Sequence, residues 1–319
     1  AWIDAMFNAP PTIANVNGTL TVTPAPGTRL AYTTDGTDPR ALGGGVASTA
    51  TLSSGPVTLS NTLNLQARSY SASFNSNTVP GSPWSSAIGN PGRLINLSIL
   101  TELAAADTFT MGFVVGGAGT SGAKPLLARA AGPSLGQLGV TAFLPDPTMS
   151  LNNTSSSPAV TVATNNDWNG TAALSTAFAA VGAFAYAAPA SKDAAIFQSS
   201  LAPGNYTVQV SDTGPGTGTV IAELYDATPA ATVGATTPRL INVSVLKHLG
   251  TGLTAGFVVG GGSAKNVLIR AIGPTLKSAF GVTGEVDDPK LTLFDSASTK
   301  IGDNDDWGGT AALTKAFSS

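Results

Sequence analysis

The sequence predicts an all-β chain of tandem β-sandwiches, an Ig/Fn3-like module followed by jelly-roll-like repeats, with at most short helices. Gly numbers 37 and Pro 21 among 319 residues, which indicates frequent turns. Only 10% of residues are charged, so the polar faces that long amphipathic helices need are scarce. Hydrophobic residues make up 42% of the chain, which is enough for each domain to bury a core.

An internal repeat organises the chain from Arg93 onward. Four blocks occur twice: RLINLSIL (93–100) and RLINVSVL (239–246), GFVVGG (112–117 and 256–261), RAAGPSL (129–135) and RAIGPTL (270–276), and NDWNGTAAL (166–174) and DDWGGTAAL (305–313). The offset between the copies changes along the chain, so insertions and deletions fall between the blocks. We therefore expect loops there.

Short alternating or β-branched runs between turn signals predict the strands of the first copy. They cover residues 94–100, 108–115, 125–130, 160–164, 194–201, 205–211 and 219–225. Residues 171–180 are Ala-rich and contain no Gly or Pro, which predicts one short helix. This number of short strands is typical of a sandwich.

These observations divide the chain into a lead-in segment (1–11), a first module (12–92), repeat one (93–228), a Pro-bounded linker (229–238) and repeat two (239–319). Repeat two matches repeat one as far as Phe317, the counterpart of Phe178, and so lacks counterparts of residues 181–226. A sandwich without its last strands exposes core faces and backbone edges. Either the natural protein continues, or a strand of another chain completes the domain and builds a fibre.

The first module carries a specific set of motifs: YTTDGTDPR (32–40), PVTL (56–59), LQARSY (65–70) and the closing pair Trp84-Ser85. Together they resemble the small Fn3-like module at the C-terminus of chitobiases and hexosaminidases, which also follows kinase-like CotH domains. The opening residues resemble the tail of a CotH-type domain through Trp2-Ile3-Asp4, Phe7 and Pro10-Pro11. The resemblance implies a β-sandwich within an exported, modular protein.

The repeat itself resembles modules of very large surface or autotransporter-associated proteins of Verrucomicrobia-type bacteria. GFVVGG, RAIGPTL and DDWGGTAAL carry this resemblance. In addition, LAPGNYTVQVSD (201–212) with IAELYD (221–226) resembles the closing strands of pre-peptidase C-terminal β-sandwiches. None of these families implies an active site at these residues.

Charge and composition exclude several classes of partner. The formal net charge is −3, and neither sign forms blocks that would neutralise nucleic-acid phosphates or hold the chain to an anionic membrane. No apolar run is long enough for insertion into a membrane. The absence of cysteine excludes disulfides and thiolate metal sites, and a Cys-free chain rich in Thr, Ser and Gly is typical of exported bacterial proteins. We expect an extracellular or cell-surface location.

The single histidine does not predict catalysis. His248 corresponds to Glu102 in repeat one, whereas a catalytic histidine needs a nucleophile and an orienting carboxylate beside it. We expect His248 to be a surface residue after a strand, and we expect the chain not to be an enzyme.

An acidic loop in repeat two is the best metal candidate. Asp303, Asp305 and Asp306 place hard oxygen ligands close together, as Ca²⁺ prefers. The matching residues 164–167 of repeat one, TNND, carry less charge, which predicts weaker binding or none. The alternative is a solvated turn whose Asp and Asn side chains hydrogen-bond to the local backbone. The spacing of an EF-hand is absent.

The aromatic residues have two interpretations. Trp168 and Trp307 follow the acidic loops and are predicted to anchor those loops to a core. Trp84, Tyr32 and Tyr70 of the first module either pack within it or stack on the rings of a polysaccharide.

Two further motifs are assigned to turns. Asp35-Gly36 and Asp38-Pro39 contain the residue types of tight turns, so we do not interpret them as a catalytic carboxylate pair. GFVVGG lacks the lysine and the strand-to-helix context of a phosphate-binding loop, and we expect its glycines to form a hairpin turn after a buried strand.

The sequence thus predicts a non-catalytic structural or adhesive segment of a bacterial surface protein, a stalk or fibre that self-associates through the edge strands of repeat two. The alternative is a polysaccharide-binding accessory region of a larger secreted enzyme. Apart from calcium, no cofactor is predicted.

Overall fold

The structure, a computed structural model, confirms the all-β prediction. Strands predominate, and the longest helix in the described ranges, α1 (Ala172–Val181), has 10 residues. No helix in these ranges is long and apolar enough to cross a membrane. The structure describes residues 8–16, 19–35, 37–41, 44–60, 65–71, 84–85, 88–89, 92–229, 232–233, 236–249, 252–261, 265 and 267–317.

The first module is a small sandwich of two sheets. One sheet has the order β1-β2-β5 and contains β1 (Thr12–Val16), β2 (Thr19–Thr23) and β5 (Val57–Ser60). The other has the order β4-β3-β6-β7 and contains β3 (Arg29–Thr33), β4 (Thr51–Ser53), β6 (Gln66–Tyr70) and β7 (Ile88–Gly89). The core contains Leu20, Val22, Leu30, Leu65 and Ala67. The predicted CotH-like residues Trp2 to Phe7, and Gly36, lie outside the described residues.

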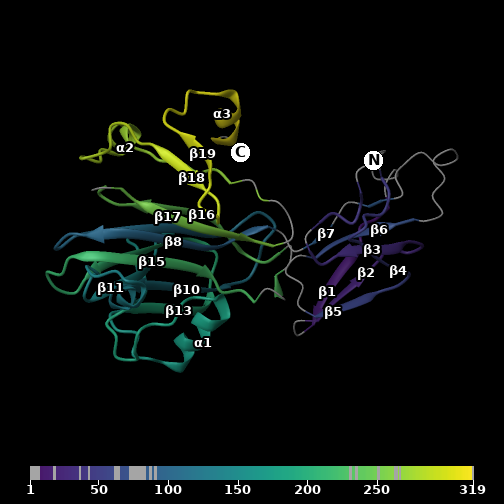
Figure 1. Ribbon diagram of the computed structural model, residues 1–319, viewed down its shortest axis with the longest axis horizontal. Coiled ribbons are helices and arrows are strands. Elements are labelled where there is room, and N and C mark those ends of the chain that lie inside the picture. The colour runs from purple at the N-terminus through teal and green to yellow at the C-terminus, as the bar shows by residue number, and fades with distance from the viewer. Residues whose placement is uncertain are drawn as a thin grey trace. The chain divides into compact units, whose positions relative to one another are not determined.

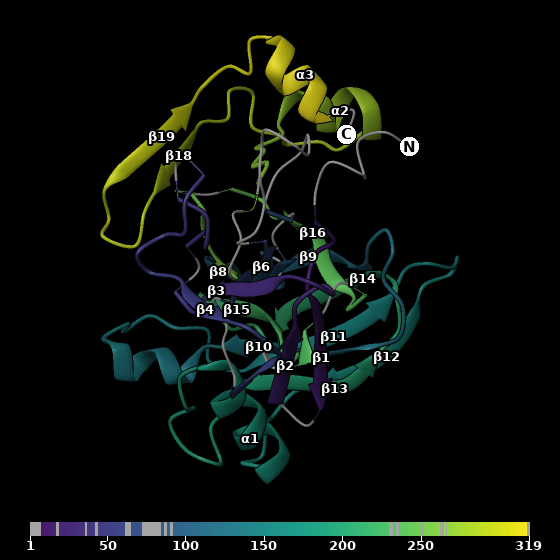
Figure 2. The same ribbon diagram turned by 90° about the vertical axis from the view of Figure 1, so that its right-hand side faces the viewer.

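Repeat one forms a larger sandwich of two sheets, here called sheet A and sheet B (Figures 1 and 2). Sheet A contains β8 (Arg93–Leu103), β15 (Gly218–Asp226), β10 (Lys124–Ala131) and β13 (Ala194–Leu201), in that order. Sheet B contains β9 (Thr108–Gly116), β14 (Gly204–Asp212), β11 (Pro147–Asn153) and β12 (Val160–Asn165). Alternate residues of both sheets form one core, including Ile99, Met111, Val208 and Leu224.

All seven strands predicted for repeat one are present, as is the predicted helix, α1. Strand β11 was not predicted. Its sequence PTMSLNN alternates as a strand should, with Met149 and Leu151 buried, but its polar residues are also those of a loop. A short 3₁₀ helix, η2 (Pro133–Leu138), follows β10 because Pro133 cannot continue the strand ladder.

Repeat two begins inside the sandwich of repeat one. Strand β16 (Arg239–Leu246) pairs with β9 and extends sheet B (Figure 2), while β17 (Thr254–Gly260) pairs with β8 and extends sheet A (Figure 1). Leu240 is buried within the core of repeat one, and Phe257 packs against that core. Residue 239, predicted as a domain boundary, is therefore the start of the sequence repeat but not the end of a structural unit. The compact unit that contains repeat one comprises residues 1–246 and 253–265.

The remainder of repeat two, residues 247–252 and 266–319, is a separate compact unit. It contains α2 (Pro274–Phe280), the antiparallel pair β18 (Leu291–Phe294) and β19 (Lys300–Asn304), and α3 (Ala311–Phe317). Residues 267–272, the counterpart of β10, are not a strand. The second sandwich predicted from the repeat is thus not formed in the described part of this unit, and large apolar side chains such as Phe280 (73% exposed) face solvent.

Candidate functional site

The three candidate calcium ligands are exposed at the end of β19: Asp303 belongs to the strand, and Asp305 and Asp306 follow it. Asp303 forms an ion pair with Lys300 at 3.2 Å, and Asp305 forms one with Lys290 at 2.8 Å. Asn304 donates a hydrogen bond from Nδ2 to the backbone carbonyl of Asp306 at 2.9 Å. In the described part of the chain, no three His, Cys, Asp or Glu side chains are grouped as a metal site requires. Calcium binding stays a prediction.

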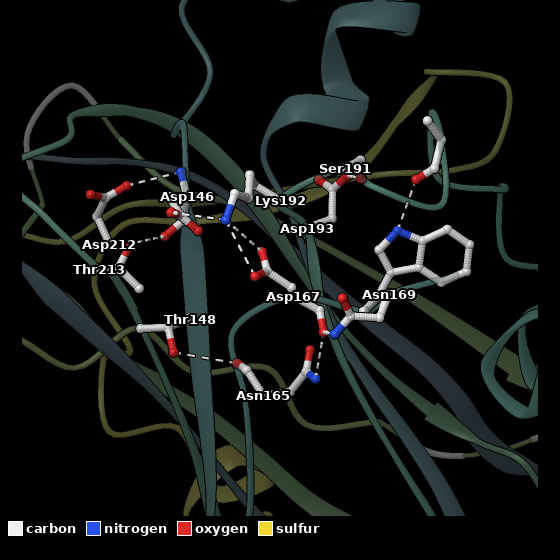
Figure 3. A network of polar contacts seen from close by, with 12 residues as sticks. Asp146, Thr148, Asn165, Asp167, Asn169, Ser191, Lys192, Asp193, Asp212 and Thr213 are labelled. Carbon is white, nitrogen blue, oxygen red and sulfur yellow. Dashed lines mark hydrogen bonds and ion pairs between the residues drawn. The ribbon is translucent and has the colours of Figure 1, made fainter. Parts of the chain in front are cut away.

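In repeat one, Lys192 lies beside the matching loop (Figure 3). Its ammonium is 3.2 Å from Asp167 Oδ1 and 3.9 Å from Asp146 Oδ2. Asp212 Oδ2 accepts a hydrogen bond from the Asp146 backbone N–H, and Asn165 Nδ2 donates to the carbonyl of Asp167 at 2.9 Å. The bond from Asn to the local backbone, which the turn interpretation predicts, is therefore present in both repeats, and a lysine of the protein neutralises the carboxylates here.

The two tryptophans after these loops differ. Trp168 is 6% exposed, donates from Nε1 to the Ala188 carbonyl and packs against Phe178 and Tyr186, so it is the predicted anchor. Trp307 is 53% exposed and contacts Phe317. The anchor prediction is thus confirmed for repeat one only. Tyr186 and Ala188, which contact Trp168, have no aligned counterparts in repeat two.

Arg129 of the RAAGPSL block is completely buried. Strand pairing places it directly opposite Glu223, and its Nη1 lies 3.0 Å from Glu223 Oε2. The guanidinium carbon lies 4.3 to 4.4 Å from the ring centroids of Phe178, Phe184 and Tyr186. A paired guanidinium inside an aromatic cage joins helix α1 and the loop after it to sheet A.

The glycine of the same block is required by a close backbone approach. A Cβ on Gly132 would lie 2.0 Å from the carbonyl oxygen of Leu144, and one on Gly273 would meet a carbonyl at 1.8 Å. Asp193 accepts hydrogen bonds from the backbone N–H groups of Gly132 and Ser134, and its second oxygen accepts one from the Ser134 hydroxyl. This block therefore forms a packed corner of the sandwich.

A second buried ionic cluster joins β8, β10 and β15. Asp226 accepts from Lys124 Nζ at 2.6 Å and from Arg93 Nε at 3.2 Å, and all three side chains are at most 4% exposed. Burial lowers the pKa of Lys124, and the neighbouring Asp226 carboxylate partly opposes that effect. One carboxylate thus neutralises two buried cations.

Two buried tyrosines next to the Arg129 cage predict a loss of stability in alkali. Burial raises the pKa of the Tyr186 and Tyr225 hydroxyls well above the usual value of 10.0. Above pH 10 the unfolded chain loses these protons while the folded chain keeps them, so the free energy of unfolding falls. We expect up to about 1.4 kcal/mol per pH unit for each tyrosine.

The measurement is urea unfolding between pH 10.5 and 11.5, with Tyr186→Phe as the comparison. The lowered pKa of Lys124 gives the opposite slope, which fades as the pH rises above the usual lysine value of 10.5. Both proteins contain Lys124, so this contribution cancels in the comparison. Tyr186→Phe should reduce the slope by about 1.4 kcal/mol per pH unit. An unchanged slope contradicts the assignment.

In the first module, both carboxylates of the TDGTDP motif have structural partners. Asp35 accepts hydrogen bonds from the Thr37 hydroxyl and backbone N–H, which lower the pKa of Asp35. Asp38 accepts two hydrogen bonds of 2.7 Å from Arg68. Each carboxylate also accepts a hydrogen bond from a backbone N–H two residues later, of Thr37 and of Arg40, as the turn interpretation predicts.

Trp84 belongs to the core of the first module. It is 1% exposed, donates from Nε1 to the Gly44 carbonyl, and its ring centroid lies 4.5 Å from that of Tyr70. The packing interpretation is therefore confirmed for Trp84. His248, also as predicted, is exposed shortly after the end of β16.

The two repeats meet through two strand pairs of matching register. In the pair β9–β16, Gly112 lies opposite Ser244, and in the pair β8–β17, Gly256 lies opposite Ser98. Ser98 and Ser244 are equivalent in the repeat, as are Gly112 and Gly256. Both pairs also contain a register shift at the same place, next to the isoleucine of the RLIN block. The first strands of the two repeats are thus related by a local two-fold axis.

A single contact marks that axis. Leu94 of β8 pairs with Leu240 of β16, and these two leucines are equivalent positions of the repeat. A residue that pairs with its own counterpart must lie beside a two-fold axis. The interface between the repeats is therefore of the isologous kind, as in a symmetric dimer, although both halves belong to one chain.

The first glycine of GFVVGG serves this interface. A Cβ on Gly112 would lie 2.8 Å from Ser244 Oγ, and one on Gly256 would lie 2.9 Å from Ser98 Oγ. The later pair, Gly116 and Gly117, has positive φ angles and ends β9, as expected for turn glycines. The predicted hairpin is wrong, however, because the next strand, β10, lies in the other sheet.

Fold and contacts together define an all-β chain in which a sandwich repeat is extended by the first strands of a second copy. Comparisons with protein-family models, curated proteins and solved structures found no match. The resemblance of the first module to chitobiase C-terminal domains stays a prediction.

Proposed function

We propose that this chain is a non-catalytic structural or adhesive segment of an extracellular bacterial surface protein, and that its repeats join by exchanging strands to build part of a stalk or fibre. The observation that supports this most is the two-fold pairing of β8 with β17 and of β9 with β16. A contact that uses both sheets at once transmits load between repeats through two hydrogen-bonded ladders rather than through a flexible linker.

The residues that recur in both copies also support a structural role. In repeat one Arg129 lies in the core with a protein partner, Gly132 fits against a carbonyl, and Gly112 allows close approach of β16. Each has an architectural reason to recur. By contrast, a pocket of about 210 Å³ on sheet B is lined by hydroxyl, amide and methionine side chains such as Ser150 and Gln209. It lacks the aromatic platform that the alternative role in polysaccharide binding favours.

Cysteine pairs test the exchange of strands, since the natural chain contains no cysteine. Ser98→Cys with Gly256→Cys should form a disulfide, because the side-chain oxygen of Ser98 lies only 2.9 Å from the position of a Cβ on residue 256. The symmetric pair, Gly112→Cys with Ser244→Cys, should do the same. Both bonds should form within one chain and raise the free energy of unfolding by about 2 to 4 kcal/mol.

Non-reducing electrophoresis, thiol titration and urea unfolding measure these outcomes, and each single cysteine variant is the control. Free thiols in both double variants under oxidising conditions would overturn the exchange of strands. Bonds between chains would show that the same surfaces pair in trans.

A further inference from the structure

Strands β16 and β17 each have one open edge in the described structure. Strand β8 is flanked by β15 and β17, and β9 is flanked by β14 and β16. In contrast, β16 pairs with β9 along its length and with β8 only at Leu240, and β17 pairs only with β8. Open edges of apolar strands are normally covered by other segments or protected by charged residues. Apart from Arg239 at the start of β16, the two strands contain no charged residue.

Their side chains are also less buried than the equivalent ones in repeat one. Val115 of β9 is 1% exposed, whereas its counterpart Val259 of β17 is 38% exposed. Phe113 is buried and its counterpart Phe257 is half-buried. The side chains of β17 that correspond to core residues of β9 are therefore not covered by a neighbouring strand as those of β9 are.

The local two-fold axis identifies what would fit there. In repeat one, β15 lies along β8 with Glu223 opposite Ser98, and β14 lies along β9 with Tyr206 opposite Phe113. The rings of Phe113 and Tyr206 are stacked with centroids 5.5 Å apart. Strand β16 is the equivalent of β8, and β17 is the equivalent of β9. The two-fold relation therefore places a strand like β15 along the open edge of β16, opposite Ser244, and a strand like β14 along the open edge of β17, opposite Phe257.

We propose that the open edges of β16 and β17 together bind a pair of strands with the chemistry of residues 204–226: apolar residues at alternate positions, a tyrosine that stacks on Phe257, and a Gly-rich turn between the strands. The partner is a peptide segment of this pattern, of the kind that another repeat carries, and it binds by strand addition. This inference rests on the proposed exchange of strands between repeats, because it uses the same axis.

The test adds a fluorescent synthetic peptide of residues 204–226 to the full chain. Anisotropy should show saturable binding of one peptide per chain, and hydrogen exchange should slow in residues 239–246 and 254–260. A control peptide with Val208→Asp and Leu224→Asp, which replaces two buried positions, should bind at least about tenfold more weakly, since a buried carboxylate without a partner costs more than 1.4 kcal/mol.

Two neighbouring chain variants serve as a matched pair. Val259→Lys places a charge where the buried Val115 lies in repeat one, whereas Val258→Lys alters the adjacent residue, which faces the other side of the strand. Both valines are exposed in the chain alone, at 38% and 48%, so both variants should fold. Val259→Lys should weaken peptide binding about tenfold or more, and Val258→Lys less than about threefold.

Absence of saturable binding, or equal loss in both lysine variants, would overturn the proposal. Slower exchange in β8 and β9 alone would also overturn it, because the peptide would then have replaced the chain's own strands. If the cysteine pairs form their bonds but the peptide does not bind, only this inference fails and the exchange of strands stands.

Discussion

Replacing Arg129 with methionine should destabilise the chain by about 3 to 5 kcal/mol. The substitution keeps the length and packing of the side chain but removes the cation that faces Glu223, which is 5% exposed. Glu223 is then left buried with the Tyr225 hydroxyl as its remaining hydrogen-bond donor. Three aromatic rings also lose the guanidinium they surround.

Arg270→Met is the matched control, because Arg270 occupies the same position of the repeat. It is exposed and its guanidinium carbon lies 4.8 Å from the ring centroid of Phe317, so its loss should change stability by no more than about 0.5 kcal/mol. Urea unfolding followed by tryptophan fluorescence measures both, since Trp168 packs beside the cage. Equal effects of the two substitutions would show that the buried ion pair is not what distinguishes the repeats.

The second large effect is expected for Asp226→Asn. This change removes the carboxylate charge that pairs with both Lys124 and Arg93 in their buried cluster. We expect a loss of about 3 to 5 kcal/mol in the free energy of unfolding. Thermal and urea unfolding of the intact chain measure this loss.

Lys124→Met tests the effect of removing one buried cation while Asp226, the carboxylate of the cluster, is kept. Burial already disfavours the charged form of Lys124, as the direction of its pKa shows, and Asp226 would keep Arg93 as its counterion. We expect a loss of about 1 kcal/mol or less. A larger loss from Lys124→Met than from Asp226→Asn would contradict this account of the cluster.

Local patterns allowed most of the sandwich of repeat one to be predicted. Alternation and β-branched residues located the strands, and the Ala-rich run located α1, because these features depend on near neighbours in the sequence. The turn role of Asp35 and the anchor role of Trp168 were predictable for the same reason. Strand β11 was missed because its Asn and Ser residues suit a loop as well as the solvent face of a strand.

The partners of the buried charges could not be predicted. Arg129 and Glu223 lie far apart in the sequence, and only the order of strands in sheet A brings them together. Similarly, the repeat pattern placed β16 and β17 in a second domain, since the closely similar strand sequences of the two copies do not indicate which copy a strand pairs with. The pairing of Gly112 with Ser244 has one signal in the sequence, a small residue recurring at the same place in both copies.

The contact around Leu94 and Leu240 limits how many copies can share it. A two-fold contact is closed: once the two repeats have paired their strands with each other, neither has that surface free for a third repeat. An array of such units would therefore be counted in couples, and a further repeat would have to attach at strand edges that the dyad leaves open, such as the outer edges of β16 and β17.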